Sequence, residues 1–224
     1  MNPTLLAAAG VAVIGGVVCV AVRESRLALA GLAVTLIVAP FIADPLPDGL
    51  ASAARLVGAL LAAYLPWIVV RDPASVTRGT LLGWAVDALL AAAAFVIGYG
   101  AAGLGAPAVG PAEAQAAGVA LVALSVGPLV FGRDVFRLGS GAVLLVVGAL
   151  LIRVALAGTP TALEELVTAV LLVGLCGAVA FLAAGALASS VDEGLALSPD
   201  ATDAEPDVEA RRSEASVETQ PLQG

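Results

Sequence analysis

Asp87 is the only acidic residue placed well inside a long apolar stretch, "RGTLLGWAVDALLAAAAFVIGYG" (Arg78–Gly100). In a helix that starts at Gly79, it lies about 12 Å along the axis at 1.5 Å per residue. A low-dielectric environment favours the neutral form of such a carboxyl group. Asp87 is therefore a candidate proton relay or ion site. The alternative is a packing role, in which neutral Asp87 hydrogen-bonds to a neighbouring helix.

Two arginines and two glutamates lie near the ends of other apolar stretches. Arg55 is about 7 Å inside its stretch, and Arg153 lies at a comparable depth. Both can extend toward one membrane face, where Glu164 and Glu165 begin the last stretch. We expect ion pairs among these four residues at this outer face, with no arginine at the level of Asp87. The other acids expected at the outer face are Asp44 and Asp48.

Other reactive groups are scarce. The chain contains no histidine, which removes the commonest metal ligand and the usual base for a serine nucleophile. Cys19 and Cys176 lie far apart in apolar stretches and form no CxxC pattern, so we expect no metal or haem site. No Walker loop or dinucleotide-binding fingerprint is present. The sequence therefore predicts a protein that is not an enzyme, without catalytic residues or cofactors and without a nucleic-acid partner.

The composition places most of the chain in a lipid bilayer. Of its 224 residues, 60% are hydrophobic and 12% are charged, whereas a soluble domain carries about 25% charged residues. A spanning helix needs about 20 apolar residues. Seven stretches meet or approach that length: 3–22, 27–43, 50–70, 79–100, 114–132, 138–157 and 163–188. We predict an all-α, polytopic membrane bundle of about seven transmembrane helices.

Arginines occur in alternate predicted loops, and the loops between them carry acids. The arginines of these loops and of the tail are Arg23 and Arg26, Arg71 and Arg78, Arg133 and Arg137, and Arg211 and Arg212. Positively charged loops remain in the cytoplasm. The pattern predicts a multi-pass protein of the cell membrane, with its N-terminus outside and its C-terminus in the cytoplasm.

The composition changes after Ala188. Residues 189–224 hold nine of the eighteen acidic residues and two arginines, and so carry nearly all of the net charge of −8. Such a segment buries too little apolar surface to offset the entropy lost on ordering. We predict a transmembrane domain over 1–188 and a disordered, acidic cytoplasmic tail over 189–224, which either solubilises the protein or docks a partner.

Two turns of the predicted bundle share a motif. "PWIVVRD" (Pro66–Asp72) and "PLVFGRD" (Pro128–Asp134) have a proline and an Arg-Asp pair at the same spacing. Helices 3–4 and 5–6 are therefore interpreted as copies of one helical hairpin in parallel orientation. The turn "VRESRLALAG" of helices 1–2 gives a weaker third copy. Parallel repeats occur in transporters, but arginines at cytoplasmic helix ends also fix topology.

The run "GRDVFRLGSGAVLLVVGALLIRVALAGTPTALEELVTAVLLVGLCGAVAFLA" (Gly132–Ala183) resembles the small membrane subunits of respiratory complex I, multisubunit sodium/proton antiporters and membrane-bound hydrogenases. Component E of the hydrogenases is the most similar in layout. In those subunits an arginine-containing turn opens a glycine-containing helix, and Arg133-Asp134 and Gly139 occupy these places. The intramembrane glutamates of the family would fall among 138–145 and 170–177, where this chain has no acid.

The resemblance implies a non-catalytic structural or assembly subunit of an ion-translocating, antiporter-like or complex I-like membrane complex. Its partners would be other membrane subunits, and any coupling to ion transport would use Asp87. The alternative is a self-contained secondary transporter with Asp87 in its site. A membrane protein with some other role is the third interpretation.

Overall fold

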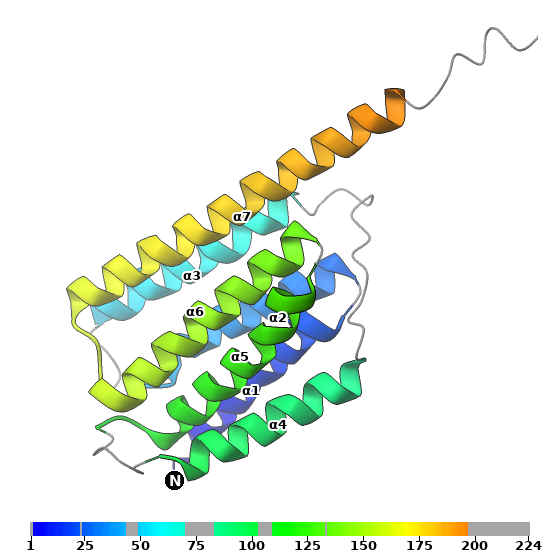
Figure 1. Ribbon diagram of the computed structural model, residues 1–224. Coiled ribbons are helices and arrows are strands. Elements are labelled where there is room, and N and C mark those ends of the chain that lie inside the picture. The colour runs from blue at the N-terminus through cyan, green and yellow to red at the C-terminus, as the bar shows by residue number, and fades with distance from the viewer. Residues whose placement is uncertain are drawn as a thin grey trace, which may run out of the picture. The chain divides into compact units, whose positions relative to one another are not determined.

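A computed structural model of the chain describes residues 2–22, 24–43, 49–69, 83–102, 109–132 and 134–196. These residues form seven α-helices, one short 3₁₀ helix and no strand (Figure 1). The elements are α1 (Pro3–Ala21), α2 (Ser25–Val38), η1 (Ala39–Phe41), α3 (Gly49–Val69), α4 (Trp84–Gly100), α5 (Ala112–Phe131), α6 (Val135–Ala157) and α7 (Ala162–Ala196). The predicted all-α class is confirmed for this part of the chain.

Four helices are long and apolar enough to cross a bilayer. They are α1, α5, α6 and the portion Ala162–Ala186 of α7. Three further apolar segments, Ser25–Phe41, the portion Ser52–Ile68 of α3 and Trp84–Gly100, have 10–17 residues, although helix α3 as a whole has 21 residues. These helices are consistent with a membrane location.

Helix α4 begins later than the sequence predicts. Gly83 has a φ of 84°, a left-handed conformation that no α-helical residue adopts, and α4 starts at the next residue, Trp84. The predicted start at Gly79 lies outside the described residues. Hydropathy does not detect this break, because glycine fits an apolar stretch as readily as it fits a helix end. Asp87 therefore lies in the first turn of the helix.

The chain divides into two units, Met1–Ala184 and Gly185–Gly224. Within the second unit, the described residues continue helix α7 to Ala196. Residues 189–196, which their composition assigns to the tail, are thus helical. A helix that is already formed gains one hydrogen bond for each added residue, so polar residues can extend it. The remainder of the predicted tail, 197–224, lies outside the described residues.

In the unit that ends at Ala184, α1 and α5 occupy the centre of the bundle (Figure 1). Helix α1 packs against α2, α4, α5 and α6, and α5 also packs against α4 and α6. Helix α3 packs on α2, and the close approach of Gly58 to Ala169 places α7 beside α3. Core side chains that are at most 1% exposed include Ala9, Ala12, Leu121, Leu124, Leu144 and Leu151.

Glycines set the distance between paired helices. A Cβ atom at Gly15 of α1 would lie 2.7 Å from the carbonyl oxygen of Gly31 in α2, so the two backbones touch. Thr35 crosses the same interface and donates from Oγ1 to a carbonyl oxygen of α1 at 3.0 Å. Gly118 and Gly148 make the corresponding contact between α5 and α6. Small residues at such positions allow the close packing that is common in membrane bundles.

The α1–α2 and α5–α6 turns have the same form. Both contain the same two backbone hydrogen bonds at equivalent positions: Val22 N to Val18 O and Gly132 N to Pro128 O, then Ala28 N to Glu24 O and Leu138 N to Asp134 O. The helix ends that flank these two turns are therefore alike, and Arg23 and Arg133 between them lie outside the described residues. The predicted motif at 66–72 continues into 70–82, which lies outside the described residues.

Both turns lie at one end of the bundle. Arg137, in the first turn of α6, donates from Nη2 to the carbonyl oxygen of Val22 at 3.4 Å. We call this the turn end. The opposite end, where Gly110 N donates to Ala155 O at 3.0 Å beside the last turn of α6, is called the loop end.

Candidate functional site

Arg55 and Glu165 form a buried ion pair at the loop end. Arg55 is contributed by α3, and Glu165 by the first turn of α7. Nε of Arg55 lies 2.9 Å from Oε2 of Glu165, and the two side chains are only 10% and 1% exposed. Removal of one partner from a buried pair costs about 3–5 kcal/mol, because the other charge remains buried. This contact therefore couples the stability of α3 to that of α7.

The pair leaves polar atoms unsatisfied. Within the described part of the chain, Nη1 of Arg55 and Oε1 of Glu165 are buried and have no hydrogen-bond partner. Oε2 of Glu165 is within ion-pair distance of Nε, but the geometry does not make a hydrogen bond. A buried polar group left in this state costs about 1–3 kcal/mol. Nη1 of Arg55 can therefore still donate a hydrogen bond, and Oε1 of the paired Glu165 can still accept one.

Arg153 and Glu164 form a second, more exposed pair beside the first. Nη2 of Arg153 lies 2.6 Å from Oε2 of Glu164, and the side chains are 36% and 49% exposed. The same Oε2 accepts a hydrogen bond from Thr161 N at 2.8 Å, and Glu164 N donates to Thr161 Oγ1 at 3.4 Å. This reciprocal arrangement is a capping box at the start of α7. The sequence "TALE" (Thr161–Glu164) has the Thr-x-x-Glu pattern of this motif. Its hydrogen bonds hold the Glu164 side chain at the start of α7 independently of the ion pair with Arg153.

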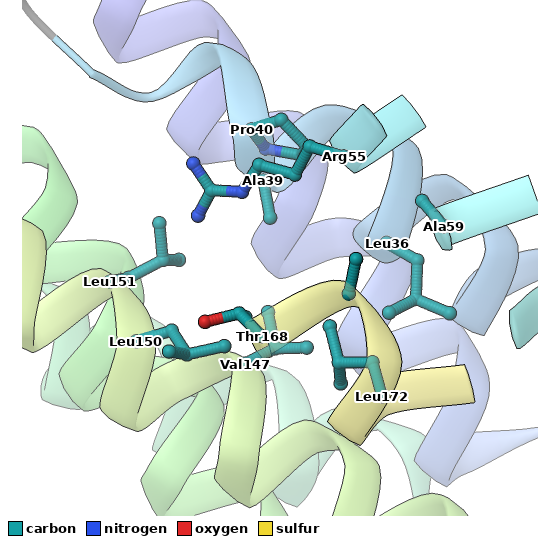
Figure 2. A pocket seen from close by; sticks show the side chains of 11 residues that line it. Leu36, Ala39, Pro40, Arg55, Ala59, Val147, Leu150, Leu151, Thr168 and Leu172 are labelled. Atoms are coloured by element: carbon teal, nitrogen blue, oxygen red, sulfur yellow. The ribbon is translucent and has the colours of Figure 1, made fainter. Parts of the chain in front are cut away.

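A hollow of about 300 Å³ opens between α3, α6 and α7 at these pairs. All four charged residues line it, and its apolar lining includes Leu150, Val154, Leu163 and Val167. A smaller cavity of about 20 Å³ shares Arg55, Leu150 and Thr168 with the hollow. Figure 2 shows the guanidinium of Arg55 projecting into this cavity, with the Thr168 hydroxyl across from it among apolar side chains. Such a space holds about one water molecule.

Asp87 belongs to the other end of the bundle. Its side chain is 7% exposed, and it is close enough to Arg137 for the two charges to attract each other. Arg137, which the sequence places in the preceding turn, lies in the first turn of α6 and thus at the same end of the bundle as Asp87. Two features account for this placement: α4 starts only at Trp84, and Arg137 donates to the carbonyl oxygen of Val22 at the end of α1. Packing of this kind leaves no signal in a single sequence.

The two groups of ionisable side chains are separated by apolar packing. Arg137 and Arg153 both belong to α6, and their separation by sixteen positions corresponds to about 24 Å of helix. No charged residue occurs in α6 between them. The structure thus brings together the predicted residues Arg55, Arg153, Glu164 and Glu165, and it places Asp87 apart from them.

Among the described residues, no three His, Cys, Asp or Glu side chains are grouped so that they could hold a metal ion. No protein-family model, curated protein or solved structure matches the chain significantly. The loop-end pocket, with its two ion pairs, is therefore the candidate site on the strength of its own geometry.

Proposed function

We propose that the protein is a seven-span membrane protein, with its N-terminus outside, that serves as a non-catalytic structural or assembly subunit of an ion-translocating membrane complex. The main support is the position of the buried ionisable groups. In the described part of the chain, the buried charged residues Arg55, Asp87, Glu113 and Glu165 lie at the two ends of the bundle, whereas a proton or sodium path through this chain would need charged groups between those ends.

The packing between the two ends favours a structural role. Leu121, Leu124, Leu144 and Val147 fill the bundle centre and are at most 3% exposed. Buried hydroxyl groups there are hydrogen-bonded: Ser125 Oγ donates to the Val122 carbonyl oxygen of its own helix at 2.7 Å, and Thr35 Oγ1 donates to the Ala12 carbonyl oxygen of α1 at 3.0 Å. A tightly packed, largely apolar core suits a scaffold that positions other subunits. The resemblance of residues 132–183 to small subunits of ion-translocating complexes points to the same role.

The outer helices present a large apolar surface for lipid and for other membrane subunits. Exposed large side chains are frequent on α3, α4 and α7, and they include Leu60, Trp67, Trp84, Leu89, Ile97, Leu166, Val170 and Phe181. A soluble monomer rarely exposes so much contiguous apolar surface. Lipid contact accounts for part of this surface, and neighbouring subunits would cover the remainder.

Co-purification tests the proposed role. The full chain, tagged and expressed at native level in its own host, should migrate in mild detergent within a larger assembly that contains antiporter-like or redox membrane proteins. A protein that runs alone, and that transports protons or sodium when reconstituted by itself, would instead establish the self-contained transporter. A protein that runs alone without flux would also contradict the proposal.

A further inference from the structure

The loop-end pocket combines balanced charges with apolar walls. Its four charged residues, two arginines and two glutamates, sum to zero. The inner pair, Arg55 and Glu165, is at least nine-tenths buried, whereas the outer pair, Arg153 and Glu164, is partly exposed at the mouth. A ligand that entered would meet the charged groups at two depths and apolar side chains around them.

The zero net charge of the four lining residues favours a ligand that is itself neutral overall. A lone anion or cation would add an uncompensated charge beside the buried Arg55–Glu165 pair, which is costly. The unsatisfied atoms, Nη1 of Arg55 and Oε1 of Glu165, are fully buried, so a ligand in the hollow reaches them only when the two side chains turn toward it; they then bind one acceptor and one donor on the same molecule. A zwitterion with an acidic oxygen group and a protonated amine supplies both and leaves the net charge at zero.

We propose that the pocket binds a small zwitterion in which an acid group and an N–H-bearing ammonium group are joined by a short chain. The acid oxygens accept from Nη1 of Arg55 and from Arg153 at the mouth. The ammonium group donates to Oε1 of Glu165. The apolar part of the molecule lies against Leu150, Val154, Leu163 and Val167.

Two sources carry this chemistry. A free aliphatic α-amino acid has a carboxylate and an ammonium group on one carbon, and a volume of about 300 Å³ accommodates it. A phosphatidylethanolamine headgroup has a phosphate and an ammonium group two carbons apart, and its acyl chains would lie outside the pocket. The inference does not depend on the subunit role, because the pocket is formed within this chain alone.

The test uses the purified full chain in detergent, with native mass spectrometry for lipids and isothermal titration for amino acids. The probes are phosphatidylethanolamine, phosphatidylcholine, phosphatidylglycerol and L-leucine. Phosphatidylcholine matters most, because its quaternary ammonium group has no N–H to donate to Glu165. We expect saturable binding of phosphatidylethanolamine in preference to the other two lipids, or saturable binding of L-leucine, and the two results identify the source.

The double variant Arg55→Gln/Glu165→Gln removes both inner charges without leaving one unpaired. It should weaken binding of the preferred zwitterion by about tenfold or more, the loss expected from one charge-assisted hydrogen bond. Glu113→Gln is the matched control, because Glu113 is a buried carboxylate in the first turn of α5 that does not line the pocket. Circular dichroism should show that both variants remain helical.

Three outcomes would overturn the proposal. They are no saturable binding of either zwitterion, equal binding of phosphatidylcholine or phosphatidylglycerol in place of selectivity, and selective binding that the folded double variant retains. If the double variant does not fold, Arg153→Gln at the partly exposed mouth takes its place, and unchanged affinity in that variant also counts against the proposal.

Discussion

Nε of Arg55 and Oε2 of Glu165 lie 2.9 Å apart, although the two residues come from the third and the last helix of the chain. The contact closes the bundle at the loop end, because α3 and α7 otherwise meet through small residues such as Gly58 and Ala169. A single buried pair thus connects segments that are distant in sequence.

The Arg55–Glu165 pair should behave as a coupled unit. Arg55→Gln or Glu165→Gln alone should lower the free energy of unfolding by about 3–5 kcal/mol, because each leaves one buried charge without its partner. The double variant Arg55→Gln/Glu165→Gln should lower the free energy of unfolding by less than the sum of the two single-variant effects. Thermal unfolding in detergent, arranged as a double-mutant cycle, measures the difference, and strictly additive losses would show that the two charges do not interact.

The glycine contact between α1 and α2 makes a second prediction. Gly15→Ala places a methyl group 2.6 Å from Thr35 Oγ1 and 2.7 Å from the carbonyl oxygen of Gly31. We expect a loss of about 1–3 kcal/mol from overpacking. Gly10→Ala is the control in the same helix, because nothing lies within 4 Å of the added atom; alanine should stabilise the helix there by up to about 1 kcal/mol. Equal melting temperatures for the two variants would contradict the close crossing.

Asp87→Asn tests the transporter alternative. Asp87 lies in the first turn of α4 at the turn end, near Arg137 and away from the loop-end charges. In the proposed subunit, the asparagine variant should therefore leave ion flux through the assembled complex unchanged, with at most a modest loss of stability from the weakened attraction to Arg137. Abolished flux together with normal expression and assembly would assign Asp87 to the ion path.

Cysteine labelling tests the proposed orientation. Cys19 and Cys176 are buried, so both can be replaced by alanine before one cysteine is added at an exposed site. A membrane-impermeant maleimide applied to intact cells should label Thr159→Cys at the loop end and should not label Glu24→Cys at the turn end. The reverse pattern would place the N-terminus in the cytoplasm.

Some of these features could be predicted from the sequence, because they depend on lengths along the chain. Hydropathy predicts the helices, and the rise per residue places Arg55, Arg153, Glu164 and Glu165 at one level. Which arginine contacts which glutamate depends on how α3, α6 and α7 rotate about their axes. An apolar surface around each helix does not encode that rotation.

The misplacement of Asp87 has a different cause. Its depth depends on the φ angle of Gly83, and its neighbour Arg137 depends on how α6 packs at the turn end. Both are consequences of tertiary structure. The likeness of the helix ends at the α1–α2 and α5–α6 turns is also hard to predict from the sequence. The backbone hydrogen bonds that they share do not require the proline on which the sequence motif depends.

The order of the residues along the chain determines when the two loop-end ion pairs can form during synthesis. Arg55 and Arg153 are synthesised before Glu164 and Glu165. Neither arginine can form its ion pair until the start of α7 has been added to the chain. A nascent chain that stops before residue 161 retains two partnerless guanidinium groups. The first turn of α7 therefore supplies both carboxylates that pair with the loop-end arginines.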